Sequence, residues 1–385
     1  MVKATPRAIS LVGLFVLSSA VLPAQRVADL VARIDSGNVA DRDAAVQELA
    51  ALAAKAVPGL RRLLEDGEDR QRIAALFGIG KMGKAAAPLL PAVSKLWMLE
   101  RPAVSQAVEQ AFVDLGEVGA PELARCVPEF GIQSYACTAL AKIGPAGKPA
   151  VPALRKLLLS RTAGAHTAAT PLGAIRDPAA IPDLVKVVTE GADNPRGCDD
   201  AKVANSAQAL GRFGAAAAAA VPALIAVMRA EVPIPTMCDR AATALGDIGV
   251  RTDAVLAALR EVAKKGTGDL QRAAKDSLEV LECAAGASDG VIARAIRHAN
   301  PDLRLLGLQR AVDRGTGGSP LMPAIVWCYE HTDDVTVRIA AISALGAIGV
   351  QDEKVTRVLD AASKQPDAKL AAAAEEVRAK LARKS

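Results

Sequence analysis

A stretch of 16 residues occurs twice in the chain, with nine identical positions. Residues 209–224 read "ALGRFGAAAAAAVPAL", and residues 139–154 read "ALAKIGPAGKPAVPAL". The opening recurs as "ALGDIG" from Ala244 and as "ALGAIG" from Ala344, with weaker copies between. Units starting near residues 45, 78, 111, 139, 169, 209, 244, 278, 310 and 344 follow one another at intervals of 28 to 40 residues. A sustained period of this size predicts a stack of repeats.

Apolar residues recur at helical spacing within each unit. In residues 333–349, "DDVTVRIAAISALGAIG", they fall three or four positions apart, which is the spacing of one helix face. The two leading acids suit a helix N-terminus, and the glycine five residues after the unit start ends the helix. A proline then opens a second helix, as at Pro58, Pro91, Pro152, Pro182, Pro222 and Pro323. Each unit is therefore a predicted helical hairpin.

The composition agrees with such hairpins. The chain has 385 residues, more than one hydrophobic core usually serves, and it is 51% hydrophobic but only 2% aromatic. We therefore expect an all-α protein, a right-handed α-solenoid of about ten helical hairpins, over residues 25–385. A lone helix over residues 27–34 should cap the first unit, and the charged tail 371–385 should cap the last.

These segments resemble HEAT repeats. "QRIAALFGIGKMG" (71–83), the segment 333–349 and the second helices that read AVPAL are similar to the short bacterial HEAT-like type also found in phycobilin lyases (PBS-lyase-type repeats). The units beginning near 111, 169, 278 and 310 depart from the pattern, and three of them hold Ala174, Cys283 and Gly315 at the glycine position. The resemblance implies a scaffold or binding surface and carries no particular reaction.

The N-terminus predicts export. Lys3 and Arg7 precede an apolar run over residues 9–22, and small residues follow at Ala20 and Ala24. This is the pattern of a signal peptide over residues 1–24, with cleavage after Ala24 or, alternatively, Ala20. The run is short for a membrane span, and no second one follows, so we expect a periplasmic or extracellular protein without a transmembrane segment. Removing Lys3 and Arg7 lowers the net charge from +5 to +3, too little to favour nucleic acid as a partner.

Two short motifs look catalytic but lack the context that their chemistry needs. "GIGKMG" (78–83) matches the dinucleotide pattern GxGxxG, yet it ends a predicted helix where a nucleotide site needs a strand before it. "GASDG" (286–290) matches the nucleophile elbow GxSxG, yet Ser288 falls in a turn between helices. Only three histidines occur, without paired metal-ligand spacing. We therefore predict no catalytic residue, no metal site and no cofactor.

Six cysteines in an exported chain permit disulfides. Cys198 and Cys238 lie in loops that lead into the first helices of consecutive units, and loops on one edge of a stack can approach within disulfide range. We therefore name Cys198–Cys238 as the candidate disulfide, with two unpaired thiols as the alternative. Cys126 with Cys137 is a poorer pair, because nothing in the sequence places their Cα atoms within the roughly 7 Å that a disulfide needs. These two, Cys283 and Cys328 resemble buried small apolar residues.

Basic residues recur 16 or 17 positions after the unit starts, in the second helices of six units. They are Arg61, Arg62, Lys95, Arg155, Lys156, Lys186, Arg260 and Arg294. Equivalent positions in a solenoid align, so these residues are a candidate binding stripe on the second-helix face, which in HEAT-like stacks is the concave one. The alternative is a solvated helix face that complements the helix dipoles. Arg62, Lys95, Lys156 and Lys186 are the favoured contributors, and Trp97 is either an aromatic anchor or inter-repeat packing.

The sequence thus favours an exported HEAT-like scaffold that binds a protein or another acidic macromolecule along its concave surface, without catalysis. One alternative is a lyase- or hydrolase-type enzyme with a site in the groove, which requires converging His, Asp, Glu or Cys side chains. Another is a structural subunit of a cell-envelope assembly. The partner, the oligomeric state and the biological process do not follow from these residues.

Overall fold

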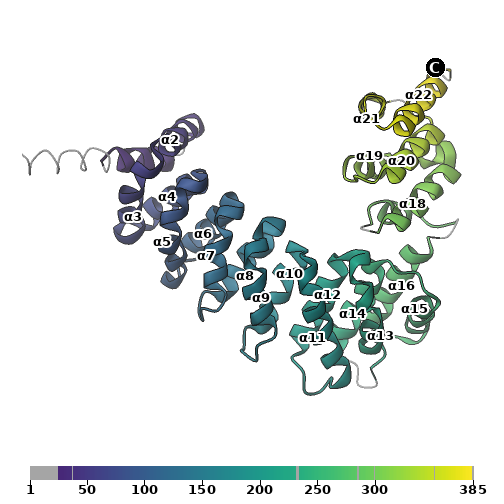
Figure 1. Ribbon diagram of the computed structural model, residues 1–385, viewed down its shortest axis with the longest axis horizontal. Helices are drawn as coiled ribbons and strands as arrows, with labels where there is room; N and C mark the ends of the chain where they lie inside the picture. Colours follow the sequence, from purple (N-terminus) through teal and green to yellow (C-terminus); the bar gives the residue numbers. More distant parts are fainter. Residues whose placement is uncertain are drawn as a thin grey trace, which may run out of the picture. The chain divides into compact units, whose positions relative to one another are not determined.

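The structure, a computed structural model, describes residues 25–36, 38–230, 234–283, 286–298, 300–350 and 352–383. The predicted signal peptide, residues 1–24, lies outside the described residues. Helices and the turns between them make up the described part of the chain, which contains no strand (Figure 1). The predicted all-α class is therefore confirmed.

The helices alternate along the chain as first and second helices. The first helices are α2 (Val39–Leu52), α4 (Asp69–Gly80), α6 (Pro102–Leu115), α8 (Gln133–Ile143), α10 (Ala169–Ile175), α12 (Asp200–Arg212), α14 (Pro235–Ile248), α16 (Gly268–Glu282), α18 (Pro301–Arg314) and α20 (Val335–Ile348). The second helices are α3 (Val57–Asp66), α5 (Leu90–Lys95), α7 (Ala120–Cys126), α9 (Val151–Leu158), α11 (Ile181–Asp193), α13 (Val221–Met228), α15 (Asp253–Lys265), α17 (Asp289–Ile296), α19 (Met322–Glu330) and α21 (Glu353–Ser363). The pairs from α2–α3 to α20–α21 give the expected ten hairpins within the described residues.

A further helix stands at each end. Residues 25–35 are helical and bury Val27, Leu30 and Val31. Val27 packs directly on α3, because a Cβ at Gly59 would lie 3.0 Å from the Val27 Cβ. The last helix, α22 (Ala368–Ala382), buries one apolar stripe, including Leu370 and Leu381, against the last core. Both predicted end helices are present in the structure.

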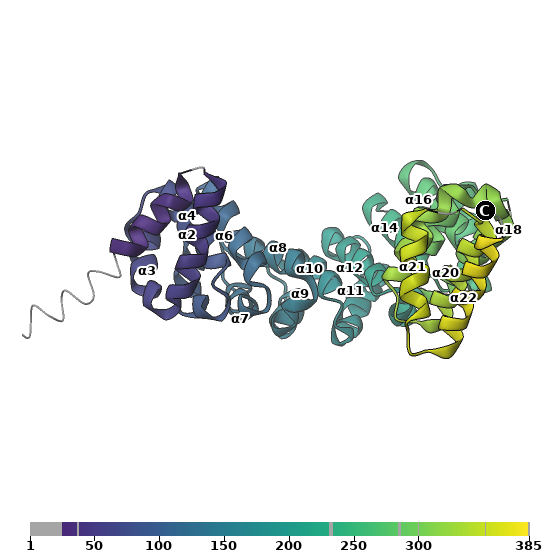
Figure 2. The same ribbon diagram turned by 90° about the horizontal axis from the view of Figure 1, so that it is seen from above.

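The chain forms two compact units, unit 1 (Met1–Asp177) and unit 2 (Pro178–Ser385). In unit 1 the first helices α4, α6, α8 and α10 form one layer and the second helices α3, α5, α7 and α9 form the other (Figure 1, Figure 2). In the first half of unit 2, α12, α14 and α16 pack in the same successive way, beside α11, α13 and α15. In these stretches, therefore, each hairpin packs directly on the next.

Glycines bring the first helices close together. A Cβ at Gly246 of α14 would lie 3.0 Å from the Ser277 Cα of α16, and one at Gly211 of α12 would lie 3.3 Å from the Ala244 Cα of α14. Gly80 and Gly346 face α6 and α22 at similarly short range. These four glycines all lie two residues after a unit start. From α4 to α10 in unit 1, and from α12 to α16 in unit 2, neighbouring first helices approach each other more closely than neighbouring second helices do.

The alanine run 215–220 is the turn inside a hairpin. Four hairpins have a seven-residue 3-10 segment here, Gly83–Leu89, Gly144–Ala150, Gly214–Ala220 and Gly315–Leu321. Each begins with a glycine in the left-handed region, at φ between 54° and 64°, which suits a residue without Cβ. Ala217 and Ala220 are buried one 3-10 turn apart while the alanines between them face solvent. The run is therefore a copy of the repeat's turn, as the sequence comparison predicts.

The three departing glycine positions have different outcomes. Gly315 has φ 54° and follows the pattern, and Cys283 takes the left-handed conformation itself, at φ 35°. Ala174 lies inside α10, and Arg176, at φ 59°, ends that helix two residues later. The turn assigned to Ala174 is therefore wrong by two residues, because α10 continues past that position.

His298 connects two first-helix regions of unit 2. Its Nε2 lies 2.9 Å from the Gly246 carbonyl oxygen, and its Nδ1 accepts from the Asn300 backbone N–H at 3.0 Å. This pairing requires the neutral tautomer with its proton on Nε2. Burial lowers the pKa of His298, and the nearby Arg304 acts in the same direction, against the hydrogen bond to Gly246.

We expect unit 2 to lose stability as the pH falls below about 6.5. Below that pH the unfolded chain binds a proton on His298, whereas the folded chain keeps His298 neutral. Acid therefore favours the unfolded state and lowers the free energy of unfolding. Above that pH His298 is neutral in both states, and its contribution to stability is fully present. The drop in thermal midpoint between pH 7.5 and pH 5.5 should shrink in His298→Gln, which cannot be protonated. Equal drops in the two proteins would contradict this assignment.

Candidate binding face on the second helices

The helix-opening prolines set a common register for the basic residues. Proline is the second residue of α3, α5, α7, α9 and α11, and a basic residue is the sixth in every one. We call these five residues the basic row: Arg62, Lys95, Arg125, Lys156 and Lys186. All five are exposed. Because the same position on parallel helices points the same way, the four members in unit 1 share one face.

Three members of the basic row have no acidic partner within the described residues: Arg62, Lys95 and Lys156. Lys186 lies 4.0 Å from Glu190 on its own helix, an exposed pair that contributes little. Uncompensated cations on one face raise the local potential for anions. The basic row is therefore the part of unit 1 best suited to hold an acidic group.

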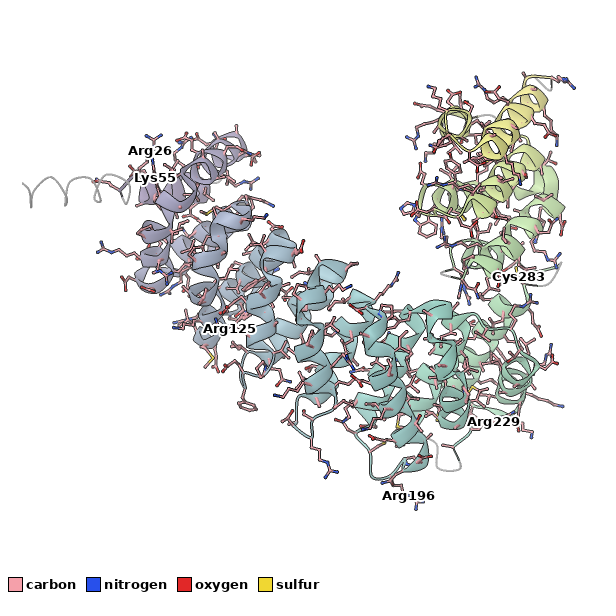
Figure 3. The ribbon with its side chains drawn as sticks, in the orientation of Figure 1. Arg26, Lys55, Arg125, Arg196, Arg229 and Cys283 are labelled. Atoms are coloured by element: carbon pink, nitrogen blue, oxygen red, sulfur yellow. The ribbon has the colours of Figure 1, made fainter. Side chains whose placement is uncertain are left out.

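Arg125 was missed by counting from the unit starts. Pro121 is the second residue of its helix, so the proline register includes Arg125, whereas offsets of 16 and 17 from residue 111 point to residues 127 and 128. Its guanidinium lies 2.9 Å from an oxygen of Glu122, a buried carboxylate that also accepts from the Ser94 hydroxyl at 2.8 Å. Glu122 thus joins α5 to α7 and positions Arg125 at the surface (Figure 3). The signal that could have found it is the proline four residues before it.

The other four residues of the predicted stripe are engaged within the protein. Arg61 donates to the Pro88 carbonyl oxygen at 2.6 Å, and Arg294 donates to that of Asp276 at 2.7 Å. Arg260 forms an ion pair with Glu282 at 2.6 Å, and Arg155 is half-buried with a partner of its own. These residues connect neighbouring elements, so the structure divides the predicted stripe into exposed and structural members.

The expected concave position of the stripe is not supported. The more closely spaced layer of a curved stack lies on its inner side, and in unit 1 that layer is formed by the first helices. The second helices are the more widely spaced layer, which leaves the basic row on the outer side of unit 1. The physical reason is the glycine-mediated approach of the first helices.

Grooves open between second helices in unit 2. A cavity of about 390 Å³ between α19 and α21 is lined by Met322, Val326 and Trp327, with Glu330, Lys354 and Arg357 at its rim. Trp327 occupies the sixth position of α19, where other second helices hold a base. Its ring stacks on His331 at 4.6 Å, so the indole is fixed in place.

Trp97 is a packing residue and not an exposed anchor. It is 1% exposed, and its ring stacks between Phe112 at 5.4 Å and Tyr135 at 5.6 Å. Its Nε1 donates to the Ser105 carbonyl oxygen at 3.3 Å. The indole thus joins the turn after α5 to α6 and α8, which is the inter-repeat packing that the sequence left as one alternative.

A groove of about 390 Å³ lies between the first helices α4 and α6. Phe77 and small residues of α6 line it, and Arg42 and Lys81 lie over the Phe77 ring at 5.2 and 5.9 Å. Its one carboxylate, Asp114, is paired with Lys81 and accepts from Gln110. Among the described residues that line this groove, Asp114 is the one with a titratable side chain, and its carboxylate is already held by Lys81.

The predicted Cys198–Cys238 disulfide is not formed in the structure. All six cysteines lie within the described residues and are free thiols. Cys238 points into the core of unit 2, where its Sγ lies 3.3 Å from the Val227 carbonyl oxygen, and the neighbouring Met237 takes the place beside Cys198, at 3.9 Å between sulfurs. The helical phase of α14 thus turns Cys238 away from the loop.

The poorer pair is not formed either. Cys126 and Cys137 are both buried, and burial raises the pKa of each thiol to about 11. Burial also raises the pKa of the other four thiols. Thiols of this kind stay protonated at neutral pH and are poor nucleophiles.

The two catalytic-looking motifs lie in structural positions. "GIGKMG" spans the end of α4 and the turn that follows, and no strand precedes it within the described residues. Ser288 is the N-cap of α17, where its hydroxyl accepts from the Val291 N–H at 3.4 Å. Within the described ranges, no group of three or more His, Cys, Asp or Glu residues is placed to hold a metal ion.

No protein-family model matches the chain, and no curated protein sequence matches it. Among solved structures it is similar to Kap121p bound to RanGTP, at 14% identity and TM-score 0.43, over 94% of this chain and 45% of Kap121p. It is similar to importin β at 11% identity and TM-score 0.40, over 95% and 63% of the two chains. Human deoxyhypusine hydroxylase matches at 17% identity and TM-score 0.30, over 69% of this chain and 99% of that one.

These three proteins are HEAT- or armadillo-like helical-repeat proteins. The similarities assign no activity to this chain. Among the helices that the structure describes, none combines the length and the apolar character needed to cross a bilayer.

Proposed function

We propose that this protein is an exported α-solenoid scaffold that binds an acidic partner protein through the basic row, without catalysing a reaction. The observation that carries the proposal is the shared position of Arg62, Lys95, Arg125 and Lys156, exposed at the sixth residue of four second helices in unit 1. A surface that repeats with the hairpin period suits an extended partner held at many points.

Export rests on the N-terminal sequence, in which a basic start, an apolar run and small residues precede residue 25. The proposed location is therefore periplasmic or extracellular. The same scaffold could also serve as a structural subunit of a cell-envelope assembly. The enzymatic alternative would require a convergent acid–base pair, and the grooves described above offer ion-paired or isolated carboxylates instead.

The test combines crosslinking in the native envelope with a charge reversal of the unpaired members. We expect the triple variant Arg62→Glu, Lys95→Glu, Lys156→Glu to recover its partner at least about tenfold less well, because each exposed ion pair contributes up to about 1 kcal/mol and like charges then repel. Arg125 is left unchanged because its removal would strand the buried Glu122.

A matched variant controls for net charge. Lys55→Glu, Arg70→Glu, Lys84→Glu changes the charge by the same amount at exposed residues outside the basic row. It should retain the partner. Equal recovery with both triple variants, or only random crosslinks in the wild type, would remove the support for the proposal. We also expect moderate salt to release the partner, because salt screens exposed charges.

A further inference from the structure

The largest exposed apolar side chains gather beside the basic row. Five large hydrophobic residues are exposed within the described residues, and four of them lie in three successive loops of unit 1. We call these four the apolar edge: Met98, Leu99, Phe130 and Leu159. Their exposed fractions are 62%, 42%, 93% and 42%. Isolated apolar residues at a surface are ordinary, but a concentration of them on one edge indicates an interaction site.

The three loops touch one another. A Cβ at Gly131, beside Phe130, would lie 3.8 Å from the Met98 sulfur. The Gln133 side chain, which follows the same loop, donates to the Gly164 carbonyl oxygen at 2.9 Å. Each of these loops therefore lies against the next one, across the second, third and fourth hairpins.

The apolar edge runs parallel to the basic row. Met98 follows Lys95 by three residues along the 3-10 helix Leu96–Leu99, and Leu159 follows Lys156 by three at the end of α9, so each pair lies on one side of its helix. Phe130 follows Arg125 across the end of α7. Each of three successive hairpins thus presents a base and, three to five residues later in the chain, an exposed apolar side chain.

The spacing of the hairpins selects the shape of a ligand that meets both rows. Packed helices lie about 8–10 Å apart, and seven residues of an α-helix rise about 10.5 Å while returning to nearly the same face. An extended strand covers that distance in about three residues, which turns its side chain to the opposite face. A helix with a seven-residue repeat therefore presents the same face to every hairpin, whereas the face of a strand alternates from one hairpin to the next.

We propose that the partner presents an amphipathic α-helix, in which an apolar residue and an acidic residue on one flank recur every seven residues. Its apolar stripe lies on the apolar edge, and its acidic flank faces Lys95, Arg125 and Lys156. The exposed charges in the same loops are mixed, with Glu100 and Glu129 as acids and Arg101 and Arg161 as bases, so the basic row sets the orientation of the helix. This inference rests on the proposed function and names the kind of partner that the same face accepts.

The test uses synthetic peptides of 18 residues with equal composition. One carries leucine and a flanking glutamate every seven residues, and the other carries the same residues every five. We expect the purified protein to bind the seven-residue peptide at least about tenfold more tightly, measured by fluorescence polarisation of the labelled peptide, since only this peptide can contact three hairpins at once. Equal binding of the two peptides would overturn the inference.

Variants at exposed positions link the binding to the two rows. Phe130→Ser and the double variant Lys95→Glu, Lys156→Glu should each weaken binding of the seven-residue peptide at least fivefold. Val39→Ser and Arg70→Glu, which change an exposed apolar residue and an exposed base elsewhere in unit 1, should leave it unchanged. Binding that ignores Phe130→Ser would overturn the inference, because the apolar edge would then take no part.

Two further probes separate this inference from the proposed function. Unstructured polyglutamate that binds through the basic row as tightly as the seven-residue peptide would overturn the helical partner and leave the acidic-partner proposal standing. Phe130-dependent flotation with phosphatidylglycerol vesicles, together with no preference between the peptides, would assign the edge to a membrane surface instead. Partner capture lost in the triple charge variant, with no peptide preference, would also overturn only the inference.

Discussion

Gly246→Val should lower the free energy of unfolding of unit 2 by about 3 kcal/mol, as overpacking between two helices typically costs 1–3 kcal/mol and the added side chain is branched at Cβ. A Cβ at this position would lie 2.5 Å from the Ser277 Oγ and 3.0 Å from the Ser277 Cα. Because the second atom belongs to the backbone, a rotamer change cannot relieve the clash. Helices α14 and α16 must separate, and the Ser277 hydroxyl then loses its 3.0 Å hydrogen bond to the Ala242 carbonyl oxygen.

The matched variant is Gly317→Val in the same unit. Gly317 is exposed, and no atom lies within 4 Å of a Cβ at that position, so the change should alter stability by no more than about 0.5 kcal/mol. Urea unfolding followed by circular dichroism measures both effects, with hydrogen exchange of α14 and α16 as the local readout. Equal midpoints for the two variants would show that α14 and α16 are not held by this contact.

The same glycines show what the sequence could and could not predict about the fold. The hairpins followed from the period and from prolines such as Pro58 and Pro91, because these are local signals that each unit carries for itself. The role of Gly246 and Gly346 was not predicted, although both stand two residues after a unit start. Which helix approaches a glycine depends on its neighbour in space, and the neighbour determines which layer is the closely spaced one.

In the candidate site, too, the local signals were predictable from the sequence and the contacts in space were not. Arg62, Lys95 and Lys156 were predicted because exposed positions repeat with the hairpin, and Arg125 was missed because the count began from a weak unit start. The Cys198–Cys238 pair failed because the direction of Cys238 depends on the phase of α14, one residue away from Met237. Spacing along a sequence predicts which residues lie on neighbouring loops, but it does not predict which side chains meet.

Trp97→Ala should cost about 3–5 kcal/mol of stability in unit 1, the usual loss when a buried aromatic side chain is truncated. The indole is 1% exposed and lies between the Phe112 and Tyr135 rings, so its removal leaves a cavity between the turn after α5 and the helices α6 and α8. The Ser105 carbonyl oxygen also loses the Nε1–H donor. Thermal unfolding of the variant measures the loss.

The comparison with Trp327→Ala decides between packing and binding for the two tryptophans of the chain. Trp327 is half-buried at the wall of an open cavity, so its truncation should cost clearly less than that of Trp97. If Trp97 were a binding anchor, Trp97→Ala would release the partner at unchanged thermal stability. Because two rings enclose Trp97, we expect the reverse: Trp97→Ala loses much of its thermal stability, and any loss of binding follows from that. A Trp97→Ala variant that stays stable would contradict the packing described for unit 1.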